Sequence, residues 1–276
     1  MNRPIRLGIS TCPNDTFAFH GLLTGAVQAR GFDIVIELLD IEELNSRMLR
    51  GEFDVCKVSF AAALAMAERV VVLPSGSALG FGVGPLLLAA TAGTRPRDEG
   101  QLTLCPGAHT TAALLFALFY PRTTRVEQVV FSDIMPRLAA GTADFGVCIH
   151  EGRFTYASHG LHLVEDLGSR WETETSCPLP LGGIVADRRL PADVIAEIQQ
   201  AIHDSLTRAL VDRAAALPTM RVHAQEFADD VLMRHVDLYV NDWTLDLGPS
   251  GHRALAEFSA RAAGLGAGTP LDVFAG

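Results

Sequence analysis

Two stretches of the sequence decide how this chain is organised: LGISTCPNDT at residues 7–16 and LTLCPGAHTT at residues 102–111. Each begins as a short apolar strand, continues through Cys-Pro, and ends in a polar turn that opens a helix. The same strand-turn-helix unit therefore occurs once in each of two parts of the chain. This repetition predicts two lobes of similar build that face each other across a cleft.

A second pair of matching segments follows in the same order. GEFD at residues 51–54 leads into the strand VCKVS at 55–59, and GTAD at 141–144 leads into FGVCIH at 145–150. The approximate spacing from the first motif agrees between the two parts. In this arrangement His150 follows a buried strand and lies at the wall of the predicted cleft.

Strands alternate with helical segments along the chain, which predicts an α/β fold with mixed, mostly parallel sheets flanked by helices. The polar, breaker-rich stretch at residues 92–100 is the predicted crossing into the second lobe. The apolar strand at 181–186 returns to the first lobe, and Pro191 opens a long helix with an apolar stripe. We therefore expect a discontinuous first lobe of residues 1–91 and 182–276, and a second lobe of residues 92–181.

The expected elements follow from apolar periodicity and from Gly and Pro positions. Expected strands are 5–10, 32–39, 55–59, 70–73, 84–90, 102–105, 126–131, 145–149, 161–164 and 181–186. Expected helices are 16–24, 41–50, 60–67, 110–119, 133–140, a long one from 191, 227–239 and 252–263.

The composition is that of an ordinary soluble, globular protein. The chain has 276 residues, of which 49% are hydrophobic and 20% charged, and this length can bury a substantial core. Its net charge of -10 argues against a nucleic-acid partner or an anionic membrane surface. No apolar run reaches the roughly 20 residues that a membrane span needs. Nothing in the sequence sets the oligomeric state.

The start of the chain and its cysteines indicate a compartment. Residues 1–6 run straight into a strand without the apolar segment of a secretory signal, so we expect a cytoplasmic protein. The five cysteines include no C-x-x-C pair and fit reduced packing residues.

Polar residues follow four of the predicted strands, at the ends where open α/β sheets bind ligands. They include Asn14, Asp15, Lys57, Ser59, His109, Thr110 and Thr111. Hydroxyls and backbone N–H groups at helix starts can bind anions. Plain helix capping is the alternative for each residue, but four such loops in a symmetric arrangement favour a ligand site for a small molecule.

Four residues have specific alternatives. An imidazole with an ordinary pKa near 6.5 can act as a base at neutral pH, so His150 is either a general base or a hydrogen-bonded structural residue. Asp15 is either a helix cap or an acid–base partner. Lys57 lies within an apolar strand, where a lysine needs a ligand or a salt bridge. His109, at a helix start, either contacts an anion or substrate, or it caps the helix or is exposed at the surface.

Common cofactor and metal motifs do not occur in the sequence. GFGVGP at residues 80–85 precedes a strand instead of following one, and Pro85 replaces the third glycine of a dinucleotide-binding loop. There is no P-loop, nucleophile elbow, H-E-x-x-H or Cys/His metal cluster.

Several segments together resemble the 1,4-dihydroxy-6-naphthoate synthases of the futalosine route of menaquinone biosynthesis. The segments are STCPNDTF at 10–17, KVS at 57–59, SGSALG at 75–80, GVGP at 82–85, HTT at 109–111 and IHEGRFTY at 149–156. The resemblance covers nearly the whole chain, including YVN at 239–241. It implies the two-lobed fold of type II periplasmic binding proteins, here in a cytoplasmic enzyme with a ligand cleft between the lobes.

The resemblance also implies a reaction. The family's substrate is cyclic dehypoxanthinyl futalosine, its product is 1,4-dihydroxy-6-naphthoate, and its carbon–carbon lyase step needs no metal or organic cofactor. By position, His150 corresponds to the family's proton acceptor, Lys57, Val58 and Ser59 to one substrate-binding strip, and Thr110 and Thr111 to another. The partner is thus a small carboxylated molecule. Two alternatives remain: chorismate dehydratase of the same pathway, and a non-catalytic binding protein for a small anion.

Overall fold

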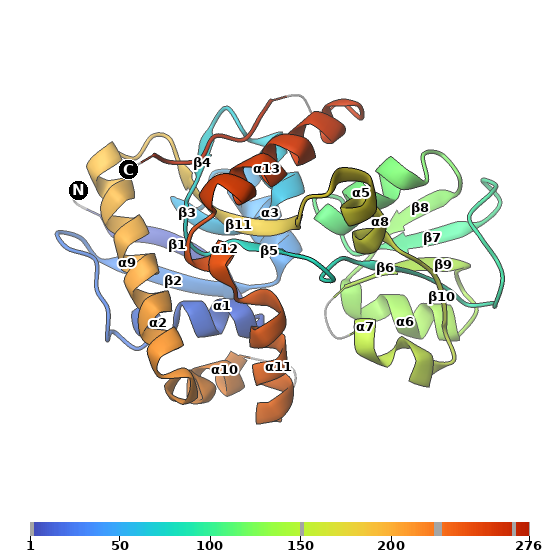
Figure 1. Cartoon of the computed structure of the whole chain (residues 1–276), viewed down its shortest axis with the longest axis horizontal. Coiled ribbons are helices and arrows are strands. Elements are labelled where there is room, and N and C mark those ends of the chain that lie inside the picture. Colours follow the sequence, from blue (N-terminus) through green and yellow to red (C-terminus); the bar gives the residue numbers. More distant parts are fainter. Residues whose placement is uncertain (1–2, 150–151, 224–227, 267–268, 276) are drawn as a thin grey trace.

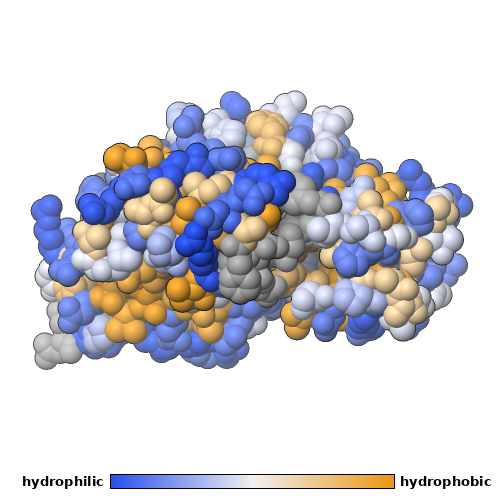
Figure 2. Space-filling model, turned by 90° about the horizontal axis from the view of Figure 1, so that it is seen from below, coloured by the Kyte–Doolittle hydropathy of each residue, from blue (hydrophilic) through white to orange (hydrophobic). Residues whose placement is uncertain are grey.

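The computed structural model describes residues 3–149, 152–223, 228–266 and 269–275. Two β-sheets lie side by side, each flanked by helices, and both ends of the chain lie in the lobe of the first sheet (Figure 1). The predicted α/β organisation in two lobes is therefore confirmed. Polar side chains cover much of the face seen from below, and apolar ones gather in smaller areas on both lobes (Figure 2). Among the described residues, no helix is long and apolar enough to cross a membrane.

The first sheet has six strands in the order β2-β1-β3-β11-β4, with β5 also pairing with β11. β1 runs parallel to β2 and β3, whereas β11 is antiparallel to β3, β4 and β5. The strands are β1 (Ile5–Ser10), β2 (Ile34–Leu39), β3 (Val55–Ser59), β4 (Val70–Val72), β5 (Ala78–Gly80) and β11 (Leu179–Asp187). The sequence analysis did not predict β5, because three residues are too few to show an alternating pattern.

The second sheet has five strands in the order β10-β6-β9-β7-β8. Here β7 is parallel to β8 and β9, and β6 is antiparallel to β9 and β10. The strands are β6 (Leu86–Ala89), β7 (Leu102–Cys105), β8 (Arg125–Gln128), β9 (Phe145–Cys148) and β10 (His162–Asp166). Both sheets are mixed as expected, but parallel pairs do not predominate. The strands that enter each lobe, β6 and β11, run opposite to their neighbours.

The chain crosses into the second lobe earlier than predicted. β6 pairs with β9, so the crossing lies at residues 81–85 and the predicted crossing at 92–100 is wrong. The return lies between β10 and β11, and β11 starts slightly before the predicted boundary at residue 182. The error has a physical cause: the apolar run at 84–90 suits a buried strand in either sheet, and its pattern does not identify its partner.

Helices cover both faces of the first sheet (Figure 1). α9 packs on one face through Ile198, and α4 and α13 contribute Phe60 and Phe258 to the core on the other. The helices are α1 (Pro13–Ala18), α2 (His20–Leu23), α3 (Ile41–Leu49), α4 (Phe60–Ala65), α5 (Thr111–Phe119), α6 (Phe131–Ala139), α7 (Gly152–Thr155), α8 (Leu167–Thr175), α9 (Ala192–Val211), α10 (Leu217–His223), α11 (Asp229–Tyr239), α12 (Asp242–Leu245) and α13 (Gly248–Ala263).

Most predicted helices are confirmed, with three differences. The helix predicted at 16–24 is the pair α1 and α2, because Phe19 leaves helical geometry with φ -93° and ψ 6°. Phe131 begins α6 and does not end a strand. α7, α8, α10 and α12 were not predicted, and the mostly polar sequence of α8, LGSRWETET, gives only a weak apolar stripe.

One hydrophobic core extends through both lobes. It joins Phe60 and Phe258 of the first lobe to Leu115 and Phe116 of α5 and to Trp171 of α8. α5 also packs against β11. The N-terminus of α5 is therefore held in place where the lobes meet.

The first crossing and α8 touch at two glycines. A Cβ atom on Gly84 would lie 2.2 Å from the Cα atom of Gly168, and one on Gly168 would lie 2.5 Å from the Cα atom of Gly84. Only hydrogen atoms fit at these positions, so the two segments pack backbone against backbone.

Replacing Gly84 by alanine is expected to lower the free energy of unfolding by about 1–3 kcal/mol, as overpacking does elsewhere. The clash is with backbone, which cannot rotate away. Chemical denaturation measures the change. The matched control is Gly152→Ala, because a Cβ atom there meets its nearest neighbour at 3.5 Å. Equal stability of the two variants would contradict the close backbone packing.

Candidate active site between the lobes

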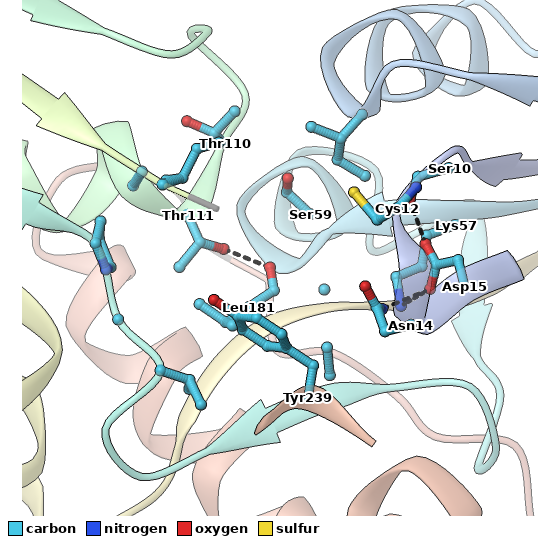
Figure 3. A pocket seen from close by; sticks show the side chains of 18 of the residues that line it. Ser10, Cys12, Asn14, Asp15, Lys57, Ser59, Thr110, Thr111, Leu181 and Tyr239 are labelled. Atoms are coloured by element: carbon cyan, nitrogen blue, oxygen red, sulfur yellow. Dashed lines mark hydrogen bonds and ion pairs between the residues drawn. The ribbon is translucent and has the colours of Figure 1, made fainter. Parts of the chain in front are cut away.

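A cavity lies where the lobes meet, at the carboxyl ends of β1 and β3 and the N-terminus of α5 (Figure 3). Its empty space, including the solvent-open mouth, is about 760 Å³. The first lobe contributes residues of β1, α1, β3, β11 and α11, and the second contributes α5 and Ile149. Much of the wall is apolar, and polar side chains form two groups. This combination is typical of small-molecule sites.

The first set of polar side chains, here called the Asp15 group, consists of Ser10, Asn14, Asp15 and Lys57. Lys57 Nζ lies 3.0 Å from Asp15 Oδ1 and donates to the Gly76 carbonyl oxygen at 2.8 Å. Ser10 Oγ donates to Asp15 Oδ2 at 2.6 Å, and Asn14 Nδ2 donates to Asp15 Oδ1 at 2.9 Å. The two charged side chains are only 5% and 4% exposed. Burial of this pair is tolerable because, besides each other, Lys57 has one hydrogen-bond partner and Asp15 has two.

The geometry decides between the two alternatives stated for Lys57. It forms a salt bridge, and it also lines the cavity, so the ion pair lies at the surface that a ligand would contact. Asp15 does not act as an N-cap, because Cys12 holds that position of α1 and Asp15 lies within the first turn.

α11 supplies a wall that the sequence analysis missed. His235 Nε2 lies 3.0 Å from Asn14 Oδ1. Because that amide oxygen can only accept, His235 Nε2 is the donor. The Tyr239 ring centroid lies 4.5 Å from that of His235, and both residues line the cavity. Their i, i+4 spacing is common in helices that pack on a core, and the resemblance at residues 239–241 assigned no role to Tyr239.

The second set of polar side chains, here called the Ser59 group, consists of Ser59, Thr110 and Thr111. Thr110 caps α5: its hydroxyl donates to the Gly107 carbonyl oxygen at 2.8 Å and accepts from the Ala113 N–H at 3.2 Å. Thr111 Oγ1 donates to the Leu181 carbonyl oxygen at 2.8 Å, which ties α5 to β11 of the first sheet. Figure 3 shows this last bond across the cavity.

Three polar hydrogens beside the cavity remain unused by the described part of the chain. The N–H groups of Thr111 and Ala112 lie in the first turn of α5, and no described residue accepts from them. The Ser59 hydroxyl accepts from Asn45 Nδ2 at 3.2 Å, and no described residue accepts its proton. All three residues line the cavity. Together with the helix dipole, these donors suit a carboxylate.

The structure brings most of the predicted site residues together. Asn14, Asp15, Lys57, Ser59, Thr110 and Thr111 all line the cavity. Val58 does not: it is fully buried in the hydrophobic core, because successive side chains of a strand point to opposite faces. His109 is not a lining residue either, although its carbonyl oxygen accepts from Asn45 Nδ2 at 3.3 Å. His150 lies outside the described residues, and Ile149 before it lines the cavity.

The five cysteines all belong to the described residues, and none forms a disulfide. Burial raises the pKa of the Cys105 and Cys148 thiols to about 12 and raises that of Cys56 well above its usual value. Cys177 is buried as well, whereas Cys12 is half-buried and lines the cavity. The predicted packing role therefore fits four of the five.

Two lobes around a ligand cavity define the class: this is a protein with a periplasmic-binding-protein-like fold. The periplasmic aliphatic sulphonate binding protein of Escherichia coli superposes with a TM-score of 0.62 at 11% identity, covering 95% of this chain and 86% of that one. A crystal structure of a protein from Archaeoglobus fulgidus superposes with a TM-score of 0.88 at 28% identity, covering 95% of this chain and 98% of that one.

Sequence comparison identifies the family within this fold class. A family described as menaquinone biosynthesis matches residues 5–264, and the chain belongs to this family. A 1,4-dihydroxy-6-naphthoate synthase from Thermus thermophilus is 43% identical over 273 residues, which is 98% of each chain. An enzyme of the same name from Streptomyces coelicolor is 40% identical over 268 residues, covering 95% of this chain and 94% of that one. The resemblance inferred from motifs is therefore confirmed.

Proposed function

We propose that this protein converts cyclic dehypoxanthinyl futalosine to 1,4-dihydroxy-6-naphthoate by a carbon–carbon lyase reaction in menaquinone biosynthesis. The observation that carries the proposal is the cavity: an apolar space between two polar groups of different character, in a chain 43% identical to a synthase of that name. The substrate has a matching layout, with a carboxylated aromatic ring at one end and a hydroxylated carbocycle at the other.

The Ser59 group is the proposed carboxylate site. The unused N–H groups of Thr111 and Ala112 and the hydroxyl proton of Ser59 would donate to the carboxylate oxygens. The Thr110 hydroxyl is already committed to capping α5, so its contribution is to hold the helix start. Hydrogen bonds to a charged acceptor are stronger than neutral ones, so this end of the cavity would orient the ring.

The Asp15 group is the proposed site for the hydroxylated carbocycle. Asp15 and Lys57 neutralise each other, so this corner offers polar contacts without a net charge to compete for the carboxylate. Asn14 is held by Asp15 on one side and His235 on the other, which fixes its amide before substrate arrives. A fixed polar surface of this kind lowers the cost of orienting a substrate.

His150 is the proposed general base. It is the next residue after Ile149, which lines the cavity. Removal of a proton from a hydroxyl of the carbocycle would let a carbonyl form at that carbon as one carbon–carbon bond breaks in retro-aldol fashion; the bonding electron pair would leave with the three-carbon fragment, which then takes up a proton. Aromatisation of the remaining ring would then drive the step. General base catalysis contributes about 10²–10⁴-fold in comparable enzymes.

A mass-spectrometric turnover assay tests the proposal. The protein is incubated with cyclic dehypoxanthinyl futalosine, with chorismate, and with neither, beside a blank without enzyme. Formation of 1,4-dihydroxy-6-naphthoate supports the proposal. Consumption of chorismate instead would assign the chain to the dehydratase of the same pathway, and stoichiometric binding without turnover would make it a binding protein.

Cys12 offers an independent test of where the product binds. Iodoacetamide at neutral pH is expected to modify Cys12 in the folded protein and the four buried cysteines only after unfolding, because the reagent must reach the sulfur atom and Cys12 is the one cysteine that is not buried. A saturating concentration of 1,4-dihydroxy-6-naphthoate should slow the labelling of Cys12 severalfold, since Cys12 lines the cavity. Peptide mass spectrometry reports both results. Labelling of Cys12 that the product leaves unchanged would argue against product binding in this cavity.

A further inference from the structure

Asn45 lies directly behind the Ser59 group and does not line the cavity itself. It belongs to α3 and is completely buried. Its Oδ1 accepts from the Ser59 N–H at 2.9 Å, and its Nδ2 donates to Ser59 Oγ at 3.2 Å. The side-chain amide thus holds both the backbone and the hydroxyl of one residue, and the first bond fixes which end of the amide is the donor.

The same amide reaches the other lobe. Asn45 Nδ2 lies 3.3 Å from the carbonyl oxygen of His109, the residue before the helix cap Thr110. The loop is pressed against α3 at Gly107, whose φ is +114°, and a Cβ atom there would lie 2.6 Å from Glu42 Oε2. Glu42 Oε2 also lies 3.3 Å from Asn45 Nδ2, so three acceptors share the two hydrogens of this amide. The loop that begins α5 therefore rests on one turn of α3.

We propose that Asn45 is a positioning residue for the carboxylate site. Because Asn45 Nδ2 donates to Ser59 Oγ, the hydroxyl accepts on that side. Its own proton can then be donated to a ligand in the cavity. The bond of Asn45 to His109 places the start of α5, with the N–H groups of Thr111 and Ala112, at the same side of the cavity. One buried amide thus aligns donors from two lobes on one anion. This inference rests on the proposed function, because it assumes a carboxylated ligand.

The main test compares Asn45→Asp with wild type. The two side chains have the same shape, but the carboxylate has no N–H to donate to Ser59 Oγ or to His109. Alignment of carboxylate donors acts on substrate and transition state alike, so KM should rise about 10–100-fold while kcat stays within about threefold. Asn45→Ala should shift KM in the same direction.

A double-variant cycle separates positioning from a general loss of packing. If Asn45 acts through Ser59, Ser59→Ala should raise KM much less in the Asn45→Ala background than in wild type. The matched control is Ser259→Ala in α13, a buried hydroxyl that donates to the Leu255 carbonyl oxygen at 2.8 Å and does not line the cavity. It should lower the melting temperature without changing KM. Asn45 variants that lose stability at unchanged KM would overturn the proposal.

Calorimetric binding of 2-naphthoate tests the role of Asn45 independently of which reaction the protein catalyses. If wild type fails to turn over the substrate yet binds 2-naphthoate, and Asn45→Asp weakens that binding tenfold or more, the proposed reaction is wrong and the role of Asn45 stands. If wild type turns over the substrate and KM is unchanged in both Asn45 variants, the reaction stands and the role of Asn45 is wrong. If wild type neither turns over the substrate nor binds 2-naphthoate, both proposals are rejected.

Discussion

Replacing Asp15 by asparagine is expected to lower the free energy of unfolding by about 3–5 kcal/mol, the usual result of leaving one buried charge without its partner. Lys57 Nζ lies 3.0 Å from Asp15 Oδ1, and the two side chains are almost completely buried. The variant leaves Lys57 only neutral acceptors, the Gly76 carbonyl oxygen and the amide oxygen of the new asparagine, and these do not balance the charge. Urea denaturation at pH 7 measures the loss.

The converse variant should cost less. In Lys57→Met the Asp15 carboxylate keeps the Ser10 hydroxyl at 2.6 Å and the Asn14 amide at 2.9 Å as donors. The double variant Asp15→Asn, Lys57→Met removes both charges, and its loss should be smaller than the sum of the single losses by about 1–3 kcal/mol. Strictly additive losses would contradict a direct interaction between the two groups.

The two-lobed organisation could be predicted because it leaves a repeated signal in the sequence. The unit of apolar strand, Cys-Pro and polar turn occurs at residues 7–16 and 102–111, and both copies border the cavity. Residues just after a strand are placed by the strand itself. This is why Asn14, Asp15, Lys57, Ser59 and Thr111, all predicted near strand ends, line one cavity in the structure.

Other parts of the site leave no local signal. His235 and Tyr239 reach the cavity from α11, more than two hundred residues after Asn14, and only tertiary packing brings them there. Asn45 lies in the first turns of an amphipathic helix, and the sequence around it does not indicate which residues its side chain contacts. The crossing at residues 81–85 was misplaced for a related reason, because strand pairing is a property of the fold and not of the segment.

In the proposed function, the two polar groups of the cavity contact different parts of the ligand. The Ser59 group combines donors from both lobes, since Ser59 comes from the first sheet and Thr111 from the second lobe. The Asp15 group belongs to the first lobe alone and is complete without a ligand. A ligand carboxylate would therefore bridge the lobes at one end of the cavity, while the other end provides a preformed surface.

His150→Ala is expected to lower kcat by about 10²–10⁴-fold, the usual contribution of a general base. KM should change little, because the proposed binding donors lie on Ser59, Thr111 and Ala112. The fold should be kept, since the chain on either side is anchored: Cys148 ends β9, and Arg153 donates to the Gly84 carbonyl oxygen and, at 2.9 Å, to Asp166 Oδ2. Single-turnover mass spectrometry measures the rate, and a melting curve checks the fold.

The pH profile distinguishes a base from a residue that merely shapes the cavity. A histidine base must be neutral to act, so kcat/KM of wild type should fall about tenfold per pH unit on the acid side of the pKa of that base. The residual activity of His150→Ala should lack this fall in kcat/KM at acid pH. The control is His162→Ala, which changes an exposed histidine of β10 and should keep both the wild-type rate and the fall at acid pH. A folded His150→Ala protein with the wild-type rate and profile would remove His150 from the mechanism. The proton would then have to go to another group that lines the cavity, for which the Asp15 carboxylate and the His235 imidazole are the first to test.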